Sequence, residues 1–80
     1  MQYIEQQLET ALQQQAPVEA LRELVIFLNQ SGLKKESLLK NFYAFDDFLR
    51  AANRNRDADY LEDVLDMMTG YYVGRNLDLV

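Results

Sequence analysis

The amino-acid sequence predicts an all-α fold: a compact antiparallel four-helix bundle followed by a short extended C-terminal tail. Apolar residues recur at helical spacing in four segments, and no strand pattern competes before the last six residues. The connections between these segments are only a few residues long, which makes neighbouring helices antiparallel. The 80 residues fit one domain, residues 1–80, and a hydrophobic fraction of 49% is ample for a packed core.

The first two predicted helices are separated by a proline. The first, residues 2–15, has an apolar stripe of Ile4, Leu8, Ala11 and Leu12. Pro17 suits the first position of the second helix, residues 17–31, because that position needs no backbone donor. Ile26 and Phe27 widen the apolar stripe of this helix, so we expect both in the core, with an exposed binding patch as the alternative. Gly32 supplies the left-handed residue that commonly ends a helix.

The third predicted helix, residues 34–53, carries apolar residues at alternating spacings of four and three, which is the heptad pattern of shallow helix crossings. Its stripe consists of Leu38, Phe42, Phe45, Leu49 and Ala52. Together the helices predict a core that contains Leu21, Leu24, Leu28, Leu38, Phe42, Phe45, Leu49, Leu61, Leu65 and Met68.

The fourth predicted helix spans residues 58–73 and follows "NRNRD", a polar run typical of a turn. Asp57 or Asp59 can cap this helix, and Asp59 with Glu62 has the spacing of a capping box.

We place the end of this helix at Gly74 in preference to Gly70, because the apolar stripe continues to Tyr72. The remaining tail should be extended, with Leu77 and Leu79 on one side.

Composition argues against most enzyme and nucleic-acid-binding classes. The chain has no Cys and no His, which excludes disulfides and thiolate zinc sites and removes the usual general base at neutral pH. Its carboxylates fan along one helix without a calcium-type loop, so we expect no metal, no cofactor and no catalysis. A net charge of -5 disfavours nucleic acids and anionic membranes and suits a basic protein partner. With no signal peptide visible and the apolar run "LVIFL" too short to span a bilayer, we expect a cytoplasmic protein.

The fourth predicted helix carries an acidic face. Asp59 with Asp63, and Glu62 with Asp66, are like-charge pairs one turn apart, and no Lys or Arg within the helix relieves them. Tolerated repulsion hints at a use for the negative field, although a face kept acidic for solubility is an open alternative. Helical geometry places Met67 and Tyr71 beside these acids, and exposed Met and Tyr near carboxylates are typical of interfaces. The predicted partner-binding residues are therefore Asp59, Glu62, Asp63, Asp66, Met67 and Tyr71.

The stretch "YLEDVLDMMTGYY" resembles the closing helix of small acidic all-helical immunity proteins from bacterial toxin systems. The similarity covers the last quarter of the chain and consists of a Leu/Asp/Met pattern that ends in Thr-Gly-aromatic. It implies a bacterial protein that neutralises a toxin, for instance a nuclease, through acidic residues that meet a basic active site. No individual binding residue is carried over from the resemblance.

Three functional hypotheses follow. The first is an immunity-type or inhibitor protein that docks a basic partner through its last helix, itself a monomer or weak homodimer. The alternative is a structural or assembly protein that homo-oligomerises through apolar surface on "VIFL", "FYAF" and "DDFL". A small transcriptional regulator is disfavoured, because the only basic cluster, Arg50, Arg54 and Arg56, is small and lies at a helix end.

Overall fold

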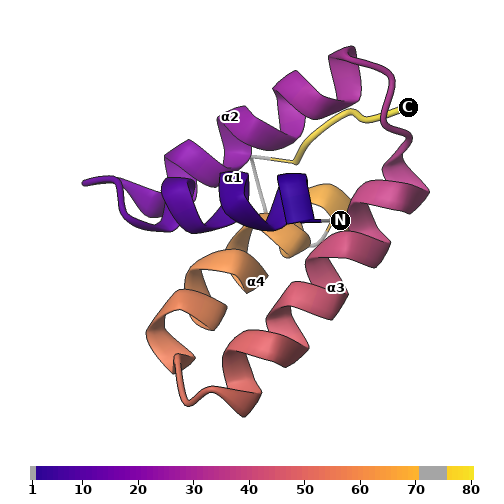
Figure 1. Ribbon diagram of the computed structural model, residues 1–80. Coiled ribbons are helices and arrows are strands. Elements are labelled where there is room, and N and C mark those ends of the chain that lie inside the picture. The colour runs from indigo at the N-terminus through magenta and orange to yellow at the C-terminus, as the bar shows by residue number, and fades with distance from the viewer. Residues whose placement is uncertain (1, 71–75) are drawn as a thin grey trace.

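Four α-helices make up most of the structure, a computed structural model that describes residues 2–70 and 76–80. They are α1 (Gln2–Leu12), α2 (Pro17–Gln30), α3 (Lys35–Ala51) and α4 (Asn55–Thr69) (Figure 1). Helices α1 and α2 form one hairpin, α3 and α4 form a second, and α2 packs against α4 to join them. The predicted all-α bundle is confirmed, and the described residues contain no strand.

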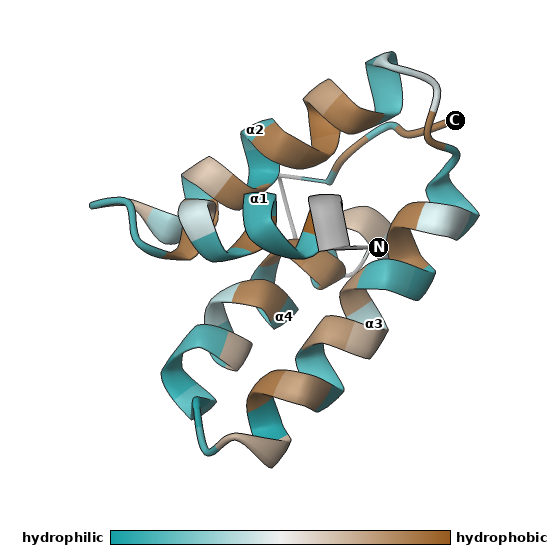
Figure 2. Cartoon of the chain, in the orientation of Figure 1, coloured by the Kyte–Doolittle hydropathy of each residue, from teal (hydrophilic) through white to brown (hydrophobic). Residues whose placement is uncertain are grey.

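The core is the apolar stripe of every helix. Along each ribbon, hydrophobic and hydrophilic residues alternate as an amphipathic helix requires (Figure 2). Nine of the ten predicted core residues are buried, and Leu24 is partly buried against the same cluster. Among the apolar residues expected inside, Phe27 is 56% exposed, Ile26 is only partly buried and Ala52 is exposed. The second helix buries the face that carries Leu21, Val25 and Leu28, and Phe27 projects from its flank.

The end of α1 and the start of α2 are set by Pro17. The helix stops at Leu12 instead of residue 15, and the next amides bond only three residues back, with Gln13 N at 3.2 Å from Thr10 O. A proline disfavours the helical conformation of the residue before it. Ala16 accordingly has φ -119° and ψ 80°, and Pro17 opens α2 as predicted.

Gly32 ends α2 as expected. Its φ of 111° is left-handed, and Leu33 N donates to Leu28 O at 3.0 Å while Gly32 N donates to Asn29 O at 3.1 Å. This pair of bonds is the Schellman motif, which satisfies the last carbonyls of a helix.

A second Schellman motif, centred on Asn53, ends α3. Asn53 has a φ of 60°, and the bonds run from Arg54 N to Leu49 O (2.8 Å) and from Asn53 N to Arg50 O (3.1 Å). Asparagine tolerates this left-handed conformation better than most residues. Because the chain reverses at one residue, α3 ends at residue 51, and α4 begins at Asn55 instead of residue 58.

The early start of α4 overturns the predicted caps. Arg54 occupies the N-cap position and no side chain caps the helix, so neither Asp57 nor Asp59 is a cap. Asp59 and Glu62 form no capping box, because Asp59 lies inside the helix and not at its N-cap. Asp57 instead lies in the first turn, where its charge favours the positive end of the helix dipole.

Gly70, not Gly74, ends α4. Gly70 has a left-handed φ of 88°, and its amide bonds to Asp66 O. Tyr72, which motivated the longer helix, lies outside the described residues.

The tail, residues 76–80, returns along α2 (Figure 1). Leu77 and Leu79 pack partly buried against the core, as predicted for one side of an extended segment. Leu77 N donates to Met67 O at 2.8 Å, and Val80 N donates to Asn29 Oδ1 at 3.3 Å, so the tail contacts both α4 and α2.

Candidate functional site

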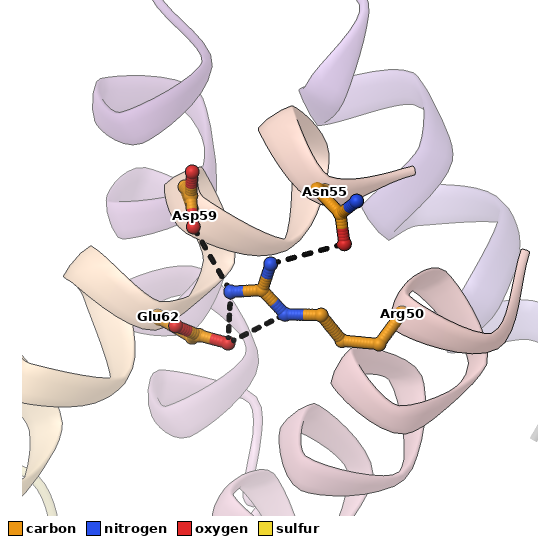
Figure 3. A network of polar contacts seen from close by, with 4 residues as sticks. All are labelled: Arg50, Asn55, Asp59 and Glu62. Atoms are coloured by element: carbon orange, nitrogen blue, oxygen red, sulfur yellow. Dashed lines mark hydrogen bonds and ion pairs between the residues drawn. The ribbon is translucent and has the colours of Figure 1, made fainter. Parts of the chain in front are cut away.

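Part of the predicted acidic face of α4 lies at the contact between α3 and α4, which we call the α3/α4 seam. Arg50, in the last turn of α3, reaches three side chains at i, i+4 and i+7 on α4 (Figure 3). Its Nη2 donates to Asp59 Oδ1 at 2.9 Å and to Glu62 Oε2 at 2.7 Å, and its Nη1 donates to Asn55 Oδ1 at 3.2 Å. The expectation that nothing relieves repulsion at Asp59 and Glu62 is therefore wrong, since the cation comes from the neighbouring helix.

Asp46, one turn before Arg50 on α3, faces the same network. Burial and a hydrogen bond with Glu62 raise the pKa of the Asp46 carboxyl to about 6. Among the described residues its Oδ1 is buried and has no hydrogen-bond partner. A protonated Asp46 can donate to Glu62, the carboxylate that Arg50 also binds.

Arg54 forms a second network that joins α1 to the α3–α4 turn. Its Nη1 and Nη2 donate to the two carboxylate oxygens of Glu9 at 2.8 and 2.6 Å, and its Nε donates to Asp57 Oδ2 at 3.1 Å. The bond to Arg54 lowers the pKa of the Glu9 carboxyl. Two of the three arginines considered for nucleic acid are thus engaged by carboxylates.

The other four predicted site residues do not form one group. Asp63 is partly buried and Asp66 is exposed, and within residues 2–70 and 76–80 neither forms an ion pair. Met67 was expected on the surface, but it is 0% exposed. The reason is that α4 buries a wide arc, and the tail bonds to the Met67 carbonyl. Tyr71 lies outside the described residues. Of the predicted site residues, Asp63 and Asp66 are thus open carboxylates, meaning that they form no ion pair within the described part of the chain.

Large aromatic side chains are exposed elsewhere, on α2 and α3. Phe27, Tyr43 and Phe48 are 56%, 51% and 53% exposed. The ring of Phe48 stacks on the buried Phe45, with centroids 5.6 Å apart, so it is held in place. The three belong to "VIFL", "FYAF" and "DDFL", whose excess of apolar residues was the sequence signal for them.

Two grooves run along the two sides of α1. The α1/α2 groove, of about 640 Å³, is lined among others by Gln7, Thr10, Gln14, Glu23, Leu24 and Phe27. The α1/α3 groove is lined by Glu5, Gln6, Glu9, Thr10, Phe45 and Phe48. Because Gln6 and Thr10 line both, the grooves form one continuous surface, the α1 surface, with Phe27 on one side and Phe48 on the other.

Every charged residue that lines the α1 surface is a glutamate. These are Glu5, Glu9 and Glu23, and within the described residues Glu9 alone forms an ion pair, with Arg54. The α1 surface thus combines exposed aromatic rings with a negative rim, the composition expected where apolar anchors meet a charged partner.

Neither metal chemistry nor a membrane span finds support in the described residues. They contain no group of three or more His, Cys, Asp or Glu side chains that could hold a metal ion. None of their helices is both long and apolar enough to cross a membrane. Comparison with models of protein families, with curated proteins and with solved structures found no match for this chain.

Proposed function

We propose that this chain is a protein-binding module that docks a basic protein partner on its α1 surface. The observation that carries the proposal is the exposure of Phe27 and Phe48 on either side of α1, although the core beneath them is complete. Rigid aromatic anchors of this kind supply much of the binding energy of protein interfaces. Docking on α1 replaces docking on α4, since Met67 is buried and Asp59 and Glu62 are already engaged.

The charge of the partner follows from the charge of this chain. The α1 surface is lined by glutamates, Asp63 and Asp66 add open carboxylates on α4, and the net charge is -5. Such a field accelerates association with a basic protein and falls with ionic strength. We assign Asp63 and Asp66 to steering, and the aromatic rings to the contact itself.

Within this class we propose an immunity-type or inhibitor role in a bacterial cytoplasm. The support is the resemblance of residues 60–72 to the closing helix of immunity proteins, which implies a toxin, such as a nuclease, as the basic partner.

Self-association through the same surface is the second candidate. The exposed rings of Phe27 and Phe48 favour it, because a dimer would cover apolar area. A two-fold dimer through the α1 surface would, however, bring Glu5 and Glu23 toward their own copies, and like charges at an interface are costly. We therefore expect a monomer or weak dimer in sedimentation at micromolar concentration. A tight dimer there would favour the structural role.

The proposed function is tested by isolating the partner from the native host and measuring its binding kinetics with purified proteins at two salt concentrations. Phe27→Ala and Phe48→Ala should each weaken binding, by about 2 kcal/mol or roughly 30-fold for a hot spot, mainly through faster dissociation. Tyr43→Ala is the matched control, since Tyr43 is equally exposed but lines neither groove.

Two results would contradict the assignment. If Tyr43→Ala weakens binding as much as the other two changes, the α1 surface has no special role. If only the pair Asp63→Asn/Asp66→Asn weakens binding, the docking surface lies on α4 as the sequence predicted.

A further inference from the structure

We infer that the α1/α2 groove holds one amphipathic helix of the partner, with an apolar stripe toward the groove and a Lys or Arg beside it. This inference rests on the proposed function and specifies the shape and chemistry of the segment that binds. It follows from the spacing of the residues that line the groove, from its apolar floor and from its single charge.

The lining has the periodicity of a helix-binding groove. From α2 it takes Ala20, Glu23, Leu24 and Phe27, which is i, i+3, i+4 and i+7 on that helix. The other side of the groove consists of Gln6, Gln7, Thr10 and Ala11 of α1 and of Gln14, which follows the end of that helix. Seven residues at 1.5 Å each make a groove about 10 Å long, or two helical turns. A third helix laid between two antiparallel helices presents its own i, i+3, i+4 and i+7 residues to such a groove.

Two of the polar residues that line the groove, Thr10 and Gln14, bond back to the α1 backbone. Thr10 Oγ1 donates to Gln6 O at 2.9 Å, and Gln14 Nε2 donates to Thr10 O at 3.0 Å. These bonds draw both side chains toward the α1 backbone. The lining also includes the small residues Ala11 and Ala20, which let a docked helix approach closely.

The polar groups that remain call for a donor. Glu23 is the only charged residue among the described lining, and it has no ion-pair partner there. The Oε1 atom of Gln7 is buried without a hydrogen-bond partner within the described part of the chain. Both groups are acceptors, so a Lys or Arg at the edge of the apolar stripe complements the groove.

The α1/α2 hairpin of a second copy of the chain supplies this chemistry poorly. Helix α1 contains no Lys or Arg, and the only one in α2 is Arg22, which lies toward the tail and not in the groove. A basic amphipathic helix from a different protein therefore fits the groove better than α1 or α2 of another copy.

The test uses the full chain and two designed peptides of about 15 residues, both with Leu at i, i+3, i+4 and i+7. One has Lys and the other Glu at all remaining positions. In amide NMR titrations the Leu/Lys peptide should shift signals of α1 and α2 around the groove, and the Leu/Glu peptide should bind at least tenfold more weakly. Phe27→Ala and Glu23→Lys should each weaken binding of the Leu/Lys peptide about tenfold or more.

Two matched controls separate the groove from the overall negative charge. Tyr43→Ala removes an equally exposed ring, and Glu36→Lys makes the same charge change on α3, so both should leave peptide affinity within about twofold of the unchanged protein. The inference is overturned if Glu36→Lys matches Glu23→Lys, if both peptides bind equally, or if the shifts map to α3 and α4. If the native partner depends on Phe48 while Phe27 and Glu23 have no effect, the helix inference fails and the proposed function stands.

Discussion

The two helical hairpins close their seams in different ways. Between α3 and α4, Arg50 bonds to Asn55, Asp59 and Glu62, so polar side chains lock the two helices together (Figure 3). Between α1 and α2 there is an open apolar groove, and Glu23 is the only charge among its described lining residues. The hairpin that looks most charged in the sequence thus uses much of its charge internally, and the less charged hairpin has the better docking surface. An acidic run indicates a binding face only after its cross-helix partners are known.

The largest effect should come from removing the buried ring under the α1 surface. Phe45→Ala is expected to lower the free energy of unfolding by about 3–5 kcal/mol, because Phe45 is 4% exposed and its loss leaves a cavity. Phe48→Ala should cost only about 0.5–1.5 kcal/mol, the contribution of its stacking on Phe45. Urea denaturation measures both, and equal losses would show that Phe48 belongs to the core rather than to the surface.

The next largest loss of stability should come from breaking the ion pairs of Arg54, which link the two hairpins. Arg54→Ala breaks the two bonds to Glu9 and the bond to Asp57, and we expect a loss of about 1 kcal/mol because the ion pair is about one-third exposed. Arg56→Ala, which removes an exposed arginine two residues on, is the control and should change stability by less than about 0.5 kcal/mol. The difference should shrink in high salt, and a difference that salt leaves unchanged would point to lost packing instead.

The α3/α4 seam should also show a pH dependence of its own. The carboxyl of Asp46 has its pKa raised to about 6, so in the range from about pH 4 to pH 6 the folded state holds a proton that the unfolded chain has released. Stability should therefore fall as the pH rises through this range. Glu62, Arg50 and Asp47 are the charged groups that act on Asp46.

Asp46→Asn should remove this fall in stability with pH. The control is Glu9→Gln, because the lowered pKa of Glu9 gives the opposite dependence, a loss of stability as the pH drops below about 4.5. Thermal unfolding from about pH 3 to pH 7 measures both. An Asp46→Asn protein that keeps the slope of the unchanged chain would remove Asp46 as its source.

The smallest effect is expected on the open acids of α4. Asp63→Asn with Asp66→Asn should leave stability unchanged or raise it by about 0.2–0.5 kcal/mol, because like charges one turn apart are relieved. Asp59→Asn with Glu62→Gln should instead lower stability, since Arg50 loses its carboxylate partners. Urea denaturation of the two double variants decides, and a common sign would mean that the four acids form one uniform face.

Most of the bundle could be predicted from the sequence because its determinants are local. Of the ten core residues that helical spacing predicted, nine are buried. Pro17 and Gly32 marked two helix boundaries correctly. The α3–α4 turn was predicted at the right place but too long, because an asparagine, Asn53, adopts the left-handed conformation usually given to glycine and reverses the chain at one residue. Gly74 was preferred to Gly70 as the end of α4 because the apolar stripe continues to Tyr72, but the structure ends the helix at Gly70.

The candidate site was much less predictable, because it depends on which helices are neighbours. The spacing of Asp59 and Glu62 gives no sign that Arg50, 9 and 12 positions earlier, lies across the seam. On an isolated α4 helix Met67 would be a surface residue, and it is buried because other segments cover it. Phe27 is an apolar residue in an apolar run, and its exposure follows from how α1 sits on α2.

The docking of the tail has a consequence for the order of events in folding. Val80 N reaches Asn29 across 51 positions, whereas each hairpin pairs segments that are adjacent in the chain. Closing a long loop costs more entropy than closing a short one, so the hairpins should form first and the tail should dock late. Contacts made after the rate-limiting step affect mainly the unfolding rate. The bonds of Leu77 and Val80 should therefore lower the unfolding rate of the bundle and have little effect on its folding rate.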